Sequence, residues 1–130
     1  MRKSGVLLPV TGLPSRYGIG TFSKEGYAFI DFLEKAGQKL WQILPLGPTG
    51  YGDSPYQSFS TFAGNPYYID LEELIEKGWL TEEECEEADY GEEAEFVDYE
   101  KIFYSRFKLL RKAYERSNIL QDGDFCRFVE

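Results

Sequence analysis

A loop of closely spaced glycines, prolines and tyrosines, residues 47–59, carries the side chains best suited to chemistry. Tyr51 and Tyr56 offer flat aromatic faces, and three polar side chains stand among them: Asp53, Ser54 and Gln57. A sugar needs both kinds of group, because its apolar ring face packs on an aromatic ring and its hydroxyls need fixed hydrogen-bonding partners. A packed structural loop whose tyrosines shield the end of a strand explains the same composition, so the residues alone leave both interpretations open.

The composition excludes several other chemistries. The sequence contains no histidine, which removes the commonest general base and leaves carboxylates as the candidate acid and base groups. Cys85 and Cys126 form no C-x-x-C pair, so we expect two free thiols in a reducing compartment and neither a metal site nor a disulfide framework. No cofactor is expected. A net charge of −9 argues against a nucleic-acid partner, which would need clustered Lys and Arg.

Hydropathy and chain order predict where this loop lies. No stretch approaches the roughly 20 apolar residues that span a bilayer, so we expect a cytoplasmic protein with no membrane partner. Residues 5–10 and 39–46 are apolar runs typical of strands buried on both faces, and residues 24–36 have helical spacing, with Ser23 as a candidate cap and Gly37 as a stop. Strand, helix and strand predict a parallel α/β unit. Residues 47–62 then follow the C-terminal end of the second strand, where barrel active sites are built.

The chain changes character near Asp70, after which the sequence is acidic and helical. We expect short helices over residues 71–77 and after a capping box of Thr81 and Glu84. A longer helix from Asp98 is expected to bury an apolar stripe, and a last one is expected to start at Asp122 or Asp124. The stripe comprises Tyr99, Phe103, Phe107, Leu110 and Tyr114.

The last expected helix has no stop signal before Glu130, and two strands cannot close an eight-stranded barrel. The sequence therefore predicts part of a longer protein, with barrel units over residues 1–70 and a truncated helical subdomain over residues 71–130. A second aromatic cluster, residues 64–70, contains Asn65 before a proline, and we expect Asn65 to hold the preceding loop in place. The acidic run 82–95 is interpreted as a solvated surface.

Four stretches resemble one known family. These are LPVTGLPS at residues 8–15, YGIG at 17–20, WQILPLGPTGYGDSPYQS at 41–58 and FAGNP at 62–66. They are similar to the amylomaltases, the bacterial 4-α-glucanotransferases of glycoside hydrolase family 77, over residues 4–71. The resemblance implies an N-terminal, incomplete part of a (β/α)8 TIM barrel with a helical inserted subdomain. The enzyme would transfer α-1,4-glucan segments between maltooligosaccharides or to glucose.

The resemblance also implies roles for particular residues. The reaction would retain anomeric configuration through a glycosyl-enzyme intermediate, with an aspartate nucleophile, a glutamate acid/base and a stabilising aspartate that all lie beyond this chain. Tyr56 would stack on the sugar beside the scissile bond, and Ser54 would line the acceptor side. Tyr51 would belong to a secondary surface site, with Tyr99 as its companion. The remaining motif residues are expected mainly to hold the loop: Asp53, Gln57 and Asn65.

Two other function classes stay open at this stage. A stand-alone carbohydrate-binding module would also need aromatic platforms, although it should have a closed core and capped ends. An acidic interaction protein would explain the Glu-rich half but not the loop of Pro, Gly and Tyr. The preferred glucan length and the oligomeric state do not follow from the sequence.

Overall fold

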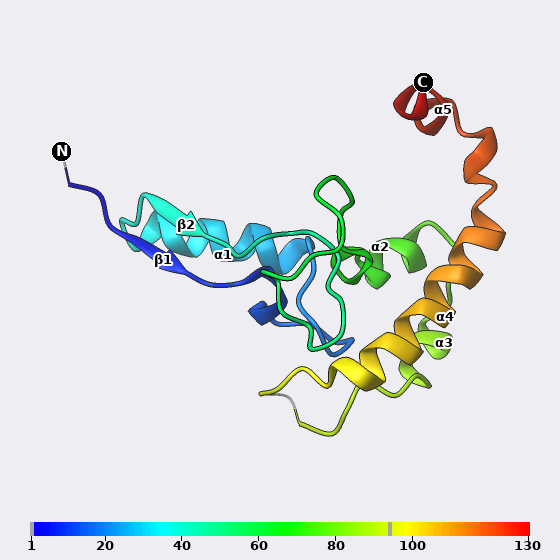
Figure 1. The fold of residues 1–130 in the computed structure, drawn as a ribbon, viewed down its shortest axis with the longest axis horizontal. Coiled ribbons are helices and arrows are strands. Elements are labelled where there is room, and N and C mark those ends of the chain that lie inside the picture. Colours follow the sequence, from blue (N-terminus) through cyan, green and yellow to red (C-terminus); the bar gives the residue numbers. More distant parts are fainter. Residues whose placement is uncertain (1, 94) are drawn as a thin grey trace.

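The computed structural model describes residues 2–93 and 95–130 of the 130-residue chain. In Figure 1 the strands and α1 lie at one end, irregular loops fill the centre, and α2 to α4 lie at the other end, with α5 beyond them. No helix in the described part of the chain is long and apolar enough to cross a membrane. The elements in chain order are β1 (Gly5–Leu7), η1 (Val10–Gly12), α1 (Lys24–Lys35), β2 (Leu40–Gln42), η2 (Pro66–Tyr68), α2 (Leu71–Glu76), α3 (Glu82–Glu86), α4 (Tyr99–Ser117), η3 (Ile119–Gln121) and α5 (Gly123–Val129).

The two strands pair in parallel, with Val6 opposite Trp41, and α1 forms the connection between them. The predicted strand–helix–strand unit is therefore confirmed, although each strand is only three residues long. The prediction that both strands are buried on both faces is wrong for this chain, because Leu7 and Leu40 are more than half exposed. The reason is that the described sheet has only these two strands, so most of its surface lacks a covering layer.

The loop that follows β1 folds into a tight, buried turn. Val10 lies in the short helix η1 rather than in the strand, and the amide of Gly20 donates to the carbonyl of Thr11 at 3.1 Å. A Cβ atom on Gly20 would lie 2.1 Å from the Val10 carbonyl oxygen, so no larger residue fits there without moving the backbone. Close packing of the turn accounts for this glycine.

Local sequence signals place most helix ends correctly. Side chains of Asp70, Asp98 and Asp122 accept hydrogen bonds from the first turns of α2, α4 and α5, and Thr81 forms the predicted capping box with Glu84. Ser23 is the exception. Its hydroxyl donates to the Glu25 carboxylate at 3.1 Å and makes no cap hydrogen bond.

The buried face of α4 differs from the predicted one. Three members of the expected stripe are substantially exposed: Phe103, Phe107 and Tyr114. The helix instead buries Ile102, Arg106, Leu109 and Ala113. Leu109 and Ala113 join the core formed with α2, α3 and Tyr17, whereas Ile102 packs with Ile19 and Tyr67. Phe103 and Tyr114 remain at least half exposed, and Phe107 packs edge-on against Tyr67.

An ion-pair network ties α3 to the C-terminal half of α4. Glu84 accepts hydrogen bonds from Arg116 at 2.7 and 2.8 Å and pairs with Lys112 at 3.2 Å. Its carboxylate also accepts from the Thr81 amide in the capping box. Arg116 most strongly, and then the Thr81 amide, lowers the pKa of Glu84 from 4.5 to about 2.

We predict that Glu84→Gln weakens the dependence of stability on acid pH. Because the folded-state pKa of Glu84 lies below its ordinary value of 4.5, these contacts stabilise the fold above that pH and are lost as the pH falls toward about 2. Urea unfolding of a longer protein that contains this chain, followed by circular dichroism between these pH values, should give a shallower slope for the variant. Glu83→Gln on the same helix is the control, and equal slopes for all three proteins would contradict the prediction.

Candidate functional site

The loop over residues 47–62 has a fixed base and a turn at its tip. Thr49 and Ser58 form an antiparallel bridge at the base. Gly52 and Asp53 both have positive φ angles, 91° and 52°, which turn the chain sharply. Asp53 tolerates this left-handed conformation because its short polar side chain bonds locally, and its carboxylate accepts from the Thr49 hydroxyl at 3.2 Å. This contact ties the tip of the loop to its base.

The loop presents its aromatic rings to solvent. Tyr51 is fully exposed and Tyr56 is 72% exposed. Between them, Ser54 is half-buried and its carbonyl accepts from the amide of Gln57 at 3.0 Å. Neither tyrosine shields the end of β2 in this chain, so the packed-loop alternative loses its support. Two flat faces on a backbone held by hydrogen bonds are suited to stacking against a ligand ring.

Residues 65–70, which we call the clamp segment, fasten this loop to the rest of the molecule. Asn65 is buried, and its backbone amide donates to the carbonyl of Leu46 at 3.0 Å. Its side-chain oxygen accepts from the backbone amide of Tyr67 at 2.9 Å. The Tyr68 carbonyl accepts from the amide of Phe22 at 3.3 Å. The side chain of Asn65 thus caps the turn η2, and its backbone amide, rather than its side chain, bonds to the base of the loop.

Tyr99 starts α4 and lies half-buried against the clamp segment. Its ring centroid is 6.2 Å from that of Tyr67. Burial raises the pKa of both tyrosines, and the nearby negative charge of Asp53 adds to the increase in each. Asp53, Tyr67 and Tyr99 therefore lie close to one another. Tyr51 makes no aromatic pair in the described part of the chain, so a shared site for Tyr51 and Tyr99 stays a prediction.

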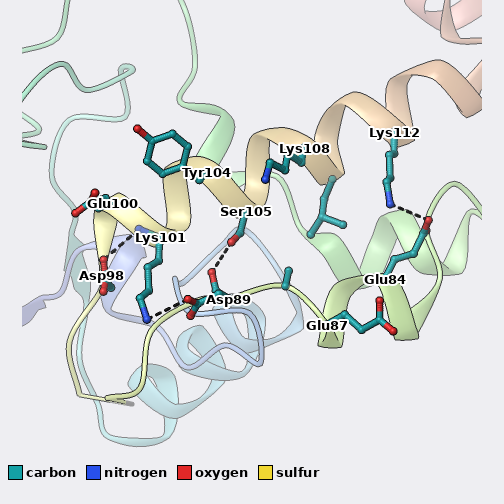
Figure 2. A pocket seen from close by; sticks show the side chains of 12 residues that line it. Glu84, Glu87, Asp89, Asp98, Glu100, Lys101, Tyr104, Ser105, Lys108 and Lys112 are labelled. Carbon is teal, nitrogen blue, oxygen red and sulfur yellow. Dashed lines mark hydrogen bonds and ion pairs between the residues drawn. The ribbon is translucent and has the colours of Figure 1, made fainter.

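A surface pocket of about 640 Å³ lies elsewhere, between α3 and α4 (Figure 2). None of the predicted site residues lines it. Figure 2 shows acidic and basic side chains facing one another, with Lys101 paired to Asp89 at 3.0 Å and Lys112 to Glu84. The pocket is lined by five carboxylates and three lysines, so its lining keeps an excess of negative charge, which disfavours an anionic ligand.

The arrangement offers exposed aromatic faces but little for bond cleavage. Glycoside chemistry needs two carboxyl groups on either side of the bond, about 5 to 5.5 Å apart in retaining enzymes. The loop 47–62 contains a single acidic residue, Asp53, which is already engaged by Thr49. Within residues 2–93 and 95–130, no group of three or more His, Cys, Asp or Glu side chains is placed to hold a metal ion.

Comparison with known proteins decides the family. A family model described as 4-alpha-glucanotransferase matches residues 8–130. The chain belongs to this family. The 4-alpha-glucanotransferase of Clostridium butyricum is 56% identical over 121 residues, which are 93% of this chain and 25% of that protein. The 4-alpha-glucanotransferase of Thermus thermophilus is 49% identical over 113 residues, 87% of this chain and 22% of that protein.

A solved glucanotransferase structure has the same fold over this region. The amylomaltase of Streptococcus agalactiae, in complex with acarbose, superposes with a TM-score of 0.88 at 45% sequence identity. The match covers 98% of this chain and 26% of that chain. The chain thus spans about a quarter of the length of the glucanotransferases it matches. Its fold is that of the corresponding part of amylomaltase.

We predict that Asn65→Ala, made in a chimera in which this chain replaces the aligned segment of the Clostridium butyricum enzyme, destabilises the protein by about 1 kcal/mol, because it removes the side-chain acceptor that caps η2. Asn65→Asp keeps an acceptor oxygen at the same place and should remain within a few tenths of a kcal/mol of the unsubstituted chain. Urea unfolding measures both variants. Equal losses for Ala and Asp would mean that the contact between Asn65 and Tyr67 is not what stabilises this turn.

Proposed function

We propose that this chain forms part of the glucan-binding cleft of a 4-α-glucanotransferase that moves α-1,4-glucan segments between maltooligosaccharides or to glucose. The observation that carries the proposal is that a chain of this family exposes Tyr51 and Tyr56 on a loop held by hydrogen bonds. The related Streptococcus agalactiae amylomaltase, solved with acarbose, supports a sugar-like ligand. The free thiols of Cys85 and Cys126 suit a reducing, cytoplasmic location.

The two tyrosines take different roles in this proposal. Tyr56 stacks on the sugar ring next to the scissile bond, and Ser54 beside it lines the acceptor side. Tyr51 takes part in a secondary glucan site on the surface, with Tyr99 as a companion whose half-buried ring leaves only part of it free to bind. Asp53, Gln57 and Asn65 keep the loop in shape through the contacts described above.

The chemistry is assigned to carboxylates outside this chain. We propose a retaining double displacement in which an aspartate attacks the anomeric carbon and a glutamate first protonates the leaving sugar and then deprotonates the acceptor hydroxyl. A second aspartate stabilises the transition state. Residues 1–70 would supply the first two β/α units of a TIM barrel, and residues 71–130 a helical subdomain inserted beside it. The parallel pair of β1 and β2 and the wholly helical α2 to α5 support this division.

A stand-alone carbohydrate-binding module fits these observations less well. Leu7 and Leu40 on the strands, and Tyr27, Ile30 and Phe32 on α1, are all at least half exposed. An independent module would bury such side chains in a core of its own, since exposed apolar patches of this kind mark contact surfaces.

We predict that Tyr56→Ala lowers kcat/KM for maltotriose by roughly tenfold to a hundredfold, because burying an aromatic face is worth about 1.5–3 kcal/mol. Tyr51→Ala should have a much smaller effect on kcat, since a surface site only recruits substrate. The protein to use is a chimera in which this chain replaces the aligned segment of the Clostridium butyricum enzyme. Tyr56→Phe keeps the ring and serves as the control. Equal and mild losses of kcat for both alanine variants would contradict these roles.

We also predict that the 130-residue chain expressed alone releases no glucose from maltotriose and is poorly soluble or partly molten. It lacks a pair of carboxylates across the scissile bond, and its strands expose apolar faces and unpaired edges. Glucose release, dye binding and thermal melting measure the three properties. Turnover that Asp53→Asn abolishes would overturn the mechanism, and a sharp melt of a monomer would favour the independent module.

A further inference from the structure

Arg106 is the one arginine that the described structure buries completely, with 0% of its surface exposed. Charged side chains are almost never fully buried unless they are paired. No carboxylate in the described part of the chain lies within ion-pair distance of Arg106. Burial lowers the pKa of its guanidinium to about 10, so the group still carries its charge at neutral pH. An unpaired cation in the core calls for an explanation beyond packing.

The guanidinium makes one hydrogen bond, and that bond leads to the clamp segment. Nη2 of Arg106 donates to the backbone carbonyl of Ile69. Nε and Nη1 find no acceptor among residues 2–93 and 95–130. The negative charge of Asp70, the residue after Ile69, favours the charged form of Arg106 without an ion pair. Among the described residues, the one hydrogen bond of this buried guanidinium therefore goes to the clamp segment, which holds the base of the loop.

Such a contact fixes position more than it adds stability. A buried charge is costly to desolvate, so a cation with one acceptor is a weak contributor to the free energy of folding. If the Ile69 carbonyl moved away, however, the charge would lose its only acceptor in a low-dielectric surrounding, where an unsatisfied group is most costly. The clamp segment is therefore held at one distance from α4.

We propose that Arg106 is a positioning residue for glucan binding, acting through the Ile69 carbonyl and the clamp segment on the loop that carries Tyr56. The path continues from Ile69 through η2 to Asn65, whose amide holds Leu46 at the base of that loop. Arg106 itself is enclosed by the core and does not touch the sugar. This inference rests on the proposed function, because it assigns a geometric support to the same site.

The test uses the chimera with the Clostridium butyricum enzyme. Arg106→Met removes the charge and the donors at similar length, and Arg106→Lys keeps a charge and a donor. Arg111→Met removes an exposed cation from the same helix and is the matched control. We expect Arg106→Met to lower kcat/KM by about tenfold with little change in Tm, because losing the hydrogen bond is offset by losing a buried charge. Arg106→Lys should recover activity to within about threefold, and Arg111→Met should leave it unchanged.

A double-mutant cycle separates positioning from a merely structural role. If Arg106 acts through the loop, its replacement should cost little more once Tyr56 is already alanine, so the two losses should not add. Full additivity, or a loss of activity in Arg106→Met that only follows a fall in Tm, would overturn the inference. Should Arg106→Met fail to fold, the cycle is run with Arg106→Leu, which also lacks the charge and the donors, and hydrogen exchange of residues 47–62 must be faster in that variant than in the unsubstituted chimera. An unsubstituted chimera without transferase activity would refute the proposed function instead.

Discussion

The backbone amide of Asn65 donates to the backbone carbonyl of Leu46, and this hydrogen bond closes the loop over residues 47–62. Its effect spreads because residues 65–70 are also fastened elsewhere. The Tyr68 carbonyl accepts from Phe22 at the entrance to α1, and Asp70 accepts from the Thr21 hydroxyl at 3.4 Å while it caps α2. One short segment thus fixes the parallel unit, the exposed loop and the helical half relative to one another. The position of the tyrosines depends on it.

This anchoring explains how an irregular loop can present exposed rings in a defined place. A loop without regular secondary structure would normally lose its shape to conformational entropy. Here the bridge between Thr49 and Ser58 and the bond from Thr49 to Asp53 limit the freedom of the tip, and Asn65 limits that of the base. The aromatic faces can then meet a ligand with little further ordering, which is the condition for specific recognition of a flexible sugar chain.

The sequence predicted the parts of the fold that follow local rules. Asp70, Asp98 and Asp122 cap helices because their side-chain oxygens satisfy free amides in the first turn, a relation visible within three or four residues. The parallel pairing followed from the order of apolar runs. The proline after Asn65 favours an extended backbone at Asn65, and the structure has one there, from which the side chain caps η2.

Features set by tertiary packing were not predictable in the same way. Two stripes on α4 have helical spacing, and hydrophobicity alone selected the aromatic one, whereas the structure buries the stripe that contains Ile102 and Arg106. Arginine is seldom fully buried, so the sequence favoured an exposed Arg106. Its burial depends on the Ile69 carbonyl, which comes from a distant part of the chain and accepts its hydrogen bond. Ser23 occupies the N-cap position of α1 as predicted, but its hydroxyl donates to the carboxylate of Glu25, two residues later, and bonds no amide of the first turn.

The outward turn of the α4 aromatics follows from the same packing choice. With Leu109 and Ala113 against α2 and α3, the helix can lie close enough for Arg106 to reach the clamp segment, and Phe107 is left to pack edge-on against Tyr67 at 5.9 Å. One face of α4 thus places Leu109 and Ala113 in the helical core and the Arg106 guanidinium against the Ile69 carbonyl, so the packing of this helix and the position of the clamp segment are fixed together.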